Sequence, residues 1–139
     1  MAVQTFTLQF ETRGDGHTLD ITGEVAQTVT RSELTDGIVT VFTPSSTSAL
    51  TTIEFEDGAV TDFRRLFDEI AAQNREYQHN LRWHDGNGHS HVRAALLGPS
   101  LTVPFGNGKL LLGTWQQIVF IDFDNRARGR NIICQVIGE

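Results

Sequence analysis

The chain has 139 residues, a hydrophobic fraction of 39% and a formal net charge of −6, values typical of one globular domain. The negative charge argues against a broad nucleic-acid interface, and no apolar run approaches the roughly 20 residues that span a bilayer. The first residues lack the basic and apolar regions of a signal peptide, and the single cysteine, Cys134, rules out an internal disulfide. We therefore expect a cytoplasmic protein without nucleic-acid or membrane partners, in which Cys134 is a small buried residue.

The N-terminal segment has the two-residue period of a β-strand. Residues 3–10 alternate in hydropathy, and one side of the expected strand carries Phe6, Leu8 and Phe10. A turn is expected at 13–16, followed by a short strand over 19–21. Thr22 is then placed to cap a helix that reaches about Leu34 and buries Val25 and Val29.

The next segment predicts two strands and the clearest helix. Residues 38–43 form a β-branched strand that ends at Pro44, and a hydroxyl-rich turn containing Thr47 follows it. A strand is expected over 49–56, with one face made up of Thr52, Glu54 and Glu56. Residues 60–74 have the hydrophobic period of a helix whose first turn holds Thr61 and Asp62, and whose charged face is solvated.

The C-terminal half is expected to consist mainly of strands. Residues 92–97 fit a short helix or a strand equally well. Strands are expected at 101–105, 117–123 and 131–137, and Gly106-Asn107-Gly108 is a hairpin signal. The total is seven or eight strands and two or three helices. This pattern predicts one α+β domain over residues 1–139 with long antiparallel stretches.

Residues 79–91 concentrate four of the five histidines of the chain: His79, His84, His89 and His91. Imidazole is the commonest protein ligand of transition metals and titrates near neutral pH. Gly86-Asn87-Gly88 interrupts regular structure, so part of this stretch is a loop, where binding residues tend to lie. The plainer interpretation is a polar surface loop that happens to contain histidines.

Two kinds of ligand fit the histidine stretch. A metal site needs three or four ligands, which the histidines could supply together with Glu54, Glu56 or Asp85. A phosphate could instead be held by Asn87, nearby backbone N–H groups and a protonated histidine, especially if a helix begins near Ser90. His89 and His91 would point to the same side of a strand but to nearly opposite sides of a helix. The secondary structure of this segment therefore decides whether both can reach one ligand.

Two further groups of residues suit ligand binding. Gly113-Thr114-Trp115-Gln116 offers a flat apolar wall and an amide that both donates and accepts hydrogen bonds; a buried tryptophan on a strand is the alternative. Arg126, Arg128 and Arg130 alternate, so they could bind phosphates or a neighbouring subunit, or they could form a solvated loop. No G-x-S-x-G motif for a serine nucleophile is present.

Several ordered motifs resemble one known family. They are Tyr77-Gln78-His79 and 87–91 in the middle of the chain, and 100–104, 108–110, 112–118, 122–124 and 126–128 near its end. Together they resemble the YjbQ-like family, whose members are described as secondary thiamine-phosphate synthases and were long of unknown function. The resemblance runs from Asp20 to Gly138, nearly the whole chain.

The resemblance implies an α+β fold with an antiparallel β-sandwich that assembles as a homotrimer. It also implies that His79, Asn87 and His91 line the site, near Trp115 and Gln116. The family usually has a histidine where this chain has Ser45, a poor zinc ligand. His89 is therefore the candidate for a third metal ligand beside His79 and His91.

The expected function is a thiamine-phosphate synthase-like reaction that joins a pyrimidine pyrophosphate to a thiazole phosphate. The candidate catalytic residues are His79, His91 and Asn87, and the candidate ligand-binding residues are Thr47, Glu54, Trp115, Gln116, Arg126 and Arg128. A divalent metal, Zn or Mg, is a possible cofactor. The alternative is a non-catalytic homotrimer that binds a metal ion or a small phosphorylated metabolite. His84 is expected to be solvent-exposed and dispensable.

Overall fold

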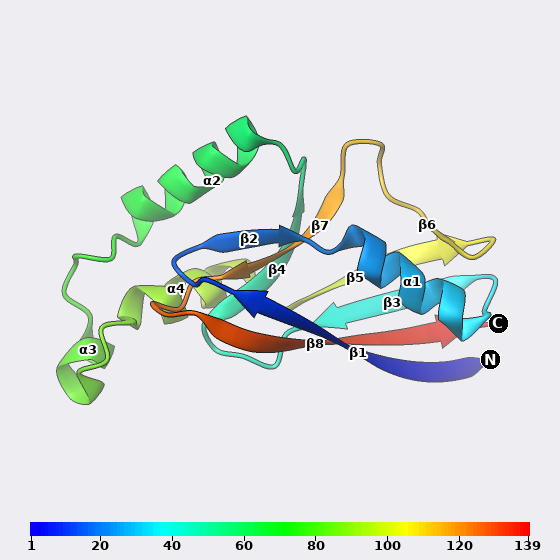
Figure 1. Cartoon of the computed structure of the whole chain (residues 1–139), viewed down its shortest axis with the longest axis horizontal. Helices are drawn as coiled ribbons and strands as arrows, with labels where there is room; N and C mark the ends of the chain where they lie inside the picture. The colour runs from blue at the N-terminus through cyan, green and yellow to red at the C-terminus, as the bar shows by residue number, and fades with distance from the viewer.

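The computed structural model describes all 139 residues, which form eight strands and four helices around two antiparallel sheets (Figure 1). The five-stranded sheet has the order β1-β8-β3-β5-β6. Its strands are β1 (Ala2–Thr12), β8 (Arg128–Gly138), β3 (Gly37–Phe42), β5 (Ser100–Gly106) and β6 (Lys109–Leu110). The three-stranded sheet has the order β2-β7-β4, with β2 (His17–Asp20), β7 (Gln117–Asp122) and β4 (Ser48–Ile53). The expected α+β sandwich is confirmed.

Strand β7 separates two hydrophobic cores, because its side chains alternate between the two faces of its sheet. Ile118 and Phe120 join a core of 13 buried residues between the two sheets, and the helix α1 (Thr22–Ser32) adds Val25 and Val29 to it. Val119 and Ile121 belong to a second core of six buried residues on the other face. There the helices α2 (Asp57–Ile70) and α4 (Gly88–Leu97) cover the three-stranded sheet. Cys134 is buried in the first core, as expected, and burial raises the pKa of its thiol to about 11.

Three predicted element boundaries were wrong. Thr22 does not cap α1: it is the first helical residue, and its hydroxyl donates to Asp20 Oδ1 and accepts from the N–H of Ile118. The strand expected over 49–56 ends at Ile53, so Glu54 and Glu56 do not lie on it. Glu56 instead caps α2: its carboxylate accepts hydrogen bonds from the N–H groups of Gly58 and Ala59, and the helix begins at Asp57, three residues earlier than the hydrophobic period indicated.

The helical content was underestimated. The short helix α3 (Gln78–Trp83) was not expected, because six residues are too few to show a helical period. The ambiguous segment 92–97 is the second half of α4. Gly88 permits the close contact between α3 and α4, since a Cβ there would lie 2.5 Å from Cβ of Tyr77.

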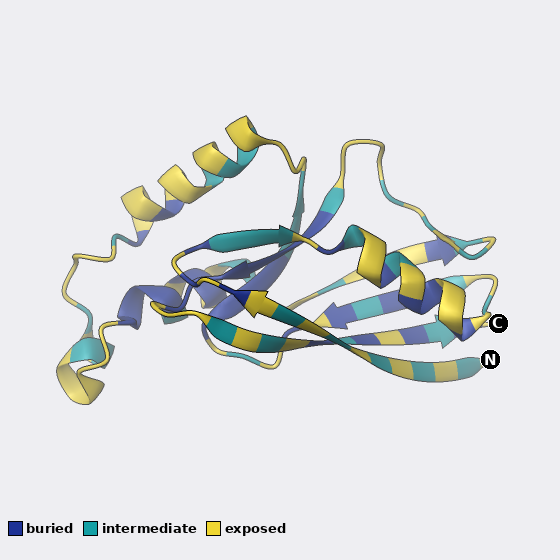
Figure 2. Ribbon diagram, in the orientation of Figure 1, coloured by how far each residue is buried: buried dark blue, intermediate teal, exposed yellow.

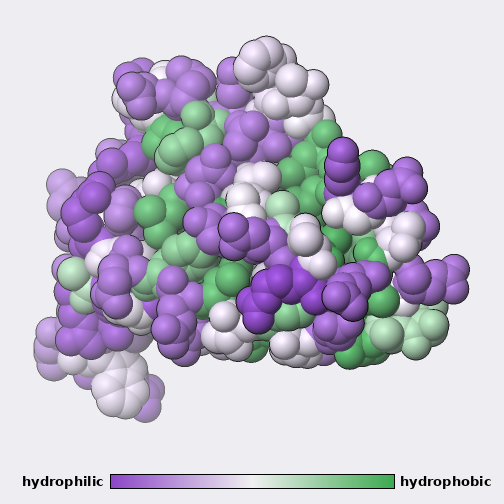
Figure 3. Space-filling view, turned by 45° about the vertical axis from the view of Figure 1, so that its right-hand side comes forward, coloured by the Kyte–Doolittle hydropathy of each residue, from purple (hydrophilic) through white to green (hydrophobic).

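Helix α2 covers its sheet only partly. Phe67 is its only buried residue, whereas Leu66 and Ile70, from the expected apolar stripe, are 46% and 44% exposed. Figure 2 shows most of this helix as exposed, and Figure 3 shows apolar side chains reaching the surface in several separate groups. None of the four helices is long and apolar enough to cross a membrane.

Candidate functional site

A polar hollow of ≈ 400 Å³ lies where β7 ends and β8 begins. The β3–β4 connection forms one side of it, the start of α4 another, and the charged residues around β8 the floor. Pro44 is the one apolar residue that lines this hollow, and the other lining residues are polar or charged: Ser45, Ser46, Thr47, Asn87, His91, Asp124, Arg128 and Arg130. The structure therefore brings Thr47, Asn87, His91 and Arg128 together, as predicted.

A buried ion pair supports the floor of the hollow. Asp122 is fully buried, and its two carboxylate oxygens accept hydrogen bonds from Nε and Nη2 of Arg130 at 2.8 and 2.9 Å. Thr12 donates a further bond of 2.6 Å to the same carboxylate. Burial alone would raise the pKa of Asp122, but the hydrogen bonds from Arg130 and Thr12 outweigh it and hold the pKa below the usual range. Asp122 is therefore ionised at neutral pH, and its carboxylate holds the guanidinium group of Arg130 in one position.

Asp124 connects three segments that meet at the hollow. Its Oδ2 accepts a bond of 3.0 Å from Thr47 of the β3–β4 connection and lies 2.9 Å from Nε of Arg128 and 3.6 Å from Nη2 of Arg130. Its Oδ1 lies 3.3 Å from the amide nitrogen of Asn87. Burial alone would raise the pKa of Asp124, but the hydrogen bonds, that from the Asn125 N–H first, outweigh it and hold the pKa below its usual range. One charged carboxylate thus positions the Thr47 hydroxyl and the guanidinium groups of Arg128 and Arg130.

His79 and His91 lie side by side at the edge of the hollow. Their ring centroids are 4.3 Å apart, although His79 belongs to α3 and His91 to α4. Nε2 of His79 is 2.9 Å from the Asn87 amide and 3.1 Å from Oδ1 of Asp85. Burial lowers the pKa of His91, and the neighbouring His79 lowers it further, because two imidazolium ions at this separation repel each other. The neutral form of His91 is therefore favoured beside His79.

The Asn87 amide has two possible orientations. In one, its nitrogen faces Asp124 and its oxygen faces His79. In the other, its nitrogen donates to Asp85 Oδ1 at 2.9 Å and to His79 Nε2 at 2.9 Å. The shorter distances favour the second orientation. In both, Asn87 links the imidazole of His79 to a carboxylate.

His89 does not join His79 and His91. Because the segment is a helix, His89 points away from His91, and it lies only 2% exposed beside the ring of Tyr77. Its Nδ1 has no hydrogen-bond partner, and burial followed by the charge of Arg93 lowers its pKa. The expectation that His89 is the third metal ligand does not fit this geometry. No group of three or more His, Cys, Asp or Glu side chains is arranged to hold a metal ion.

The N-terminus of α4 contributes little to the phosphate site that the sequence suggested as the alternative to a metal site. The helix begins at Gly88, close to the expected position, with Asn87 at the N-cap. The N–H of Gly88 is already bonded to Oδ1 of Asn80 at 2.8 Å. Anion binding at the hollow would therefore depend on arginines and hydroxyls more than on the helix N-terminus. His84 is exposed, as predicted.

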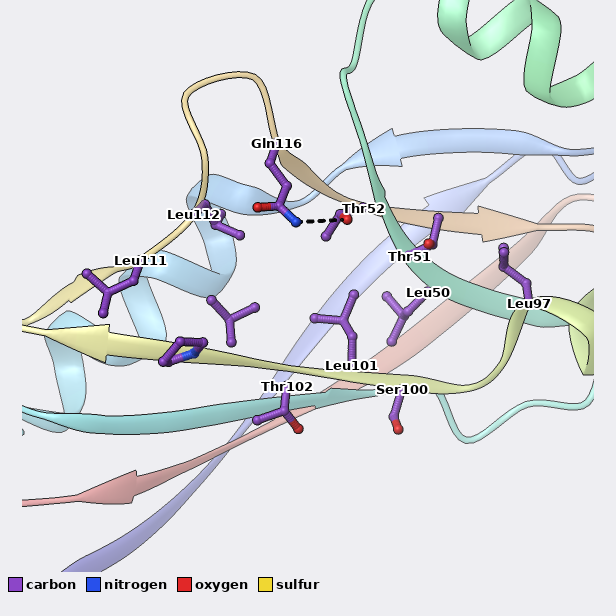
Figure 4. A pocket seen from close by; sticks show the side chains of 12 residues that line it. Leu50, Thr51, Thr52, Leu97, Ser100, Leu101, Thr102, Leu111, Leu112 and Gln116 are labelled. Atoms are coloured by element: carbon purple, nitrogen blue, oxygen red, sulfur yellow. Dashed lines mark hydrogen bonds between the residues drawn. The ribbon is translucent and has the colours of Figure 1, made fainter.

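The remaining predicted ligand-binding residues lie elsewhere. Trp115 and Gln116 precede β7, whereas Asp122 ends it, so the two groups lie at opposite ends of one strand. Gln116 lines a separate groove of ≈ 350 Å³ between β4 and β5 and donates to Thr52 Oγ1 at 3.1 Å (Figure 4). Glu54 is exposed beyond the end of β4, and Arg126 is exposed in the turn before β8. None of these four lines the hollow.

Trp115 is 71% exposed, so the alternative of a buried core tryptophan is wrong. We expect Trp115→Ala to change the free energy of unfolding by less than about 0.5 kcal/mol, because exposed side chains contribute little packing. Urea unfolding followed by circular dichroism measures this. A loss of several kcal/mol would show that the indole is packed in the folded protein.

Acid should destabilise the fold through its histidines. The pKa values of His17, His89 and His91 are lowered, first by burial, so the unfolded chain binds more protons than the folded chain near and below about pH 6.5. The contribution of these histidines to the free energy of unfolding is therefore fully present above their pKa in the unfolded chain, and it is lost as the pH drops through that pKa. We expect a lower melting temperature at about pH 5.5 than at about pH 7.5, and a smaller difference in His89→Gln. A melting temperature that rises on acidification would contradict this.

Three important residues were not among the predicted site residues: Asp122, Asp124 and Arg130. In the sequence, Asp122 and Asp124 stand out only as part of a family motif at the end of a strand, and Arg130 only as one of three alternating arginines that could bind phosphates, a neighbouring subunit or solvent. A signal was present, since Asp122-Phe123-Asp124 places two carboxylates on one side of an otherwise apolar strand. Buried carboxylates require partners, and the nearby alternating arginines were the available ones.

The chain is similar to proteins of one family. The family model described as UPF0047 protein YjbQ-like matches residues 6–139. A UPF0047 protein of Archaeoglobus fulgidus is 39% identical over 119 residues, 86% of this chain and 90% of its own. The UPF0047 protein YugU of Bacillus subtilis is 34% identical, covering 95% of this chain and 98% of its own. The crystal structure of a YbjQ-like protein of unknown function from Sulfolobus solfataricus P2 has a TM-score of 0.89 and 31% identity, covering 99% and 100% of the two chains.

Proposed function

Because the chain belongs to the YjbQ-like family of UPF0047 proteins, we propose that its polar hollow binds a small phosphorylated metabolite. The observation that carries the proposal is the lining of the hollow: two guanidinium groups, three hydroxyl-bearing residues and an imidazole, with Pro44 as its one apolar residue. Guanidinium and hydroxyl donors match the oxygens of a phosphate group. The terminal nitrogens of Arg128 form no hydrogen bond within the chain and remain available to a ligand.

The reaction we propose is of the thiamine-phosphate synthase type. The ring nitrogen of a thiazole phosphate attacks the exocyclic methylene carbon of a pyrimidine pyrophosphate, a C–N bond forms, and the C–O bond to pyrophosphate breaks. The leaving pyrophosphate carries the electron pair of that bond. Arg128 and Arg130 would stabilise its charge, and the His79–His91 pair would supply a proton to it. The fixed positions of these groups support the proposal, because preorganised charges need no rearrangement during the reaction.

A divalent metal is not part of the proposed steps. The family resemblance allowed Zn or Mg, but His79 and His91 have no third histidine beside them, and Ser45 and Asn87 are weak ligands. The residues of the hollow therefore do not fit a three-histidine metal centre. The two arginines offer the positive charge that a metal would otherwise supply.

A second candidate is binding without catalysis. It is favoured by Ser45, which stands where the family usually has a histidine, and by the pairing of Arg128 and Arg130 with two aspartates, which leaves the floor without net charge. In this candidate the protein is a homotrimer that holds a phosphorylated metabolite. For both candidates we propose threefold assembly and a location in the cytoplasm, where the single buried thiol would stay reduced.

Titration calorimetry with pyrophosphate and with Zn²⁺, at pH values on both sides of about 6.5, tests the binding proposal. We expect pyrophosphate to bind more tightly as the pH falls, because imidazolium attracts phosphate, whereas metal binding would weaken. The double variant His79→Ala/His91→Ala should abolish the pH dependence, and His84→Ala is the matched control. Equal pyrophosphate binding by the double variant and the unmodified protein would contradict a role for the histidine pair. Product formation from the two thiamine precursors separates the enzyme from the binding protein.

A further inference from the structure

A second polar pocket, of ≈ 290 Å³, lies between β2 and the beginning of α2 (Figure 1). It shares no lining residue with the hollow. Three basic side chains line it, and they come from three segments: Arg13 from the β1–β2 turn, His17 from β2 and Arg64 from α2. The other lining residues are Thr18, Phe55, Glu56, Asp57, Val60 and Thr61. The fold therefore gathers three basic groups at a place that the sequence did not single out.

The two arginines of this pocket form no ion pair, although acidic residues outnumber lysine and arginine by 17 to 11 in this chain. The arginines that lie within 4.0 Å of a carboxylate are Arg65, Arg93, Arg128 and Arg130. Arg64 donates one side-chain hydrogen bond, from Nη2 to the carbonyl oxygen of Asp15 at 3.1 Å, and the side chain of Arg13 donates none. Both side chains are exposed, so most of their N–H donors are open to a ligand.

His17 adds a third donor beside the two arginines. Its Nδ1 accepts a hydrogen bond of 3.0 Å from the backbone N–H of Arg13, so the neutral ring carries its proton on Nε2. Burial lowers the pKa of His17 most, the charge of Arg13 lowers it next, and Arg64 lowers it as well, whereas Asp122 raises it. Both guanidinium groups therefore lie near enough to the imidazole to act on its charge, and an anion bound among the three would favour the imidazolium form.

The two acidic residues of the pocket lie apart from this basic cluster. Neither Glu56 nor Asp57 is among the charges that shift the pKa of His17. The carboxylate oxygens of Glu56 already accept hydrogen bonds from the N–H groups of Gly58 and Ala59. With the imidazole neutral, two guanidinium groups and two carboxylates leave the pocket without net charge. Such a pocket favours a ligand with one negative charge at the basic end and disfavours a polyanion, whose further charges the two carboxylates repel.

We propose that this pocket binds a small organic monocarboxylate whose carboxylate group contacts Arg13, Arg64 and His17. The planar guanidinium group matches the two oxygens of a carboxylate in both geometry and charge. The apolar part of the molecule lies against Phe55, whose side chain is 42% exposed. Small-molecule sites measure roughly 300–1,000 Å³, so a pocket at the lower end of that range takes a ligand with a single ring or a short chain.

Titration with benzoate, followed by NMR of the histidine Cε1–H signals, tests this pocket. We expect benzoate to shift the signal of His17 and to raise its pKa, because a carboxylate beside the ring stabilises imidazolium. The signal of the exposed His84 should not move, and His17→Gln identifies which signal belongs to His17. Benzamide has the same shape without the charge and should bind roughly 10-fold more weakly or less still. Phenyl phosphate, which carries a second negative charge, should also bind more weakly than benzoate.

Arg64→Gln should weaken benzoate binding by roughly 10-fold or more and leave pyrophosphate binding at the hollow unchanged. Arg65→Gln is the matched control, because Arg65 is the next residue of α2 and has the same charge. It lies 4.0 Å from Asp62 on the surface, however, and does not line the pocket. Arg128→Ala should have the opposite pattern, with weaker pyrophosphate binding and unchanged benzoate binding. Circular dichroism verifies that each variant is folded.

The outcomes distinguish this pocket from the hollow. Equal weakening of benzoate binding by folded Arg64→Gln and Arg65→Gln would overturn the proposal, and so would equal affinities for benzoate and benzamide. An unmoved His17 signal at the solubility limit of sodium benzoate would overturn it as well. Tighter binding of phenyl phosphate than of benzoate would refute a monocarboxylate site. If benzoate binds as expected and pyrophosphate does not bind at all, the function proposed for the hollow fails and the second pocket stands.

Discussion

Asp122→Ala is expected to lower the free energy of unfolding by about 3–5 kcal/mol, the largest loss that we expect from a single charged residue. Asp122 is fully buried, and the side chain of Arg130 that it binds is only 12% exposed. Removal of the carboxylate leaves the guanidinium in the protein without its main partner, and it leaves the Thr12 hydroxyl with only the Arg128 carbonyl oxygen, at 3.3 Å, as an acceptor. The cost is mainly that of an uncompensated buried charge.

Guanidinium chloride unfolding of Asp122→Ala measures this loss. Asp62→Ala is the control, because Asp62 and Arg65 are 4.0 Å apart and both largely exposed, and such pairs contribute about 0–1 kcal/mol. A pH series adds a second check. The pKa of Asp122 is lowered in the fold, so the contribution of this residue is present above its unfolded pKa and is lost as the pH falls toward its folded pKa. A loss for Asp122→Ala no larger than that of the control would mean that Arg130 finds other partners.

Arg128→Ala is expected to weaken pyrophosphate binding by roughly 10- to 100-fold, the range that corresponds to one charged hydrogen-bonding group. Arg128 lines the hollow and is held at its Nε by Asp124, with its terminal nitrogens available. Stability should change much less than in Asp122→Ala, because the Arg128 side chain is 32% exposed and its loss leaves Asp124 with Arg130, Thr47 and the Asn125 N–H as partners.

Arg126→Ala is the matched control for Arg128→Ala. Arg126 lies two residues away and carries the same charge, but it is exposed in the turn and does not line the hollow. Its loss should change the pyrophosphate affinity only through the long-range electrostatic potential of the protein, which salt screens. Equal weakening by the two substitutions, at physiological salt, would show that the hollow is not the binding site.

The sequence determined those parts of the fold that depend on local pattern. The alternation at β1, the β-branched run of β3 and the hairpin signal Asn107-Gly108 were all confirmed, and both hairpin residues adopt positive φ. The strand period of two residues and the helix period of about 3.6 residues arise from backbone geometry, so they are visible without knowledge of any neighbouring element. The helix α3 was missed because it has too few residues to show a period, and the start of α2 was misplaced because it depends on the Glu56 carboxylate.

The residue types of the candidate site were also evident in the sequence, but their grouping was not. His79 and His91 were expected to meet, and they do so because Gly88 lets α3 and α4 approach closely. His89, two residues from His91, was expected at the same site, but the helix turns it inward. Trp115 and Gln116 were expected nearby, and a six-residue strand keeps them at the other end of the three-stranded sheet.

Only the tertiary structure decided that Thr12, Thr47, Asp122, Asp124 and Arg130 form one network. Their positions span more than a hundred residues of the chain, from β1 to β8. No local period encodes such a contact, because pairing in antiparallel sheets joins segments that are distant in sequence. A buried carboxylate binds the donors that lie within a few ångströms of it in space, whatever their separation in the sequence. The pairing of β1 with β8, and of β4 with β7, therefore determines which hydroxyl and which arginine each aspartate binds.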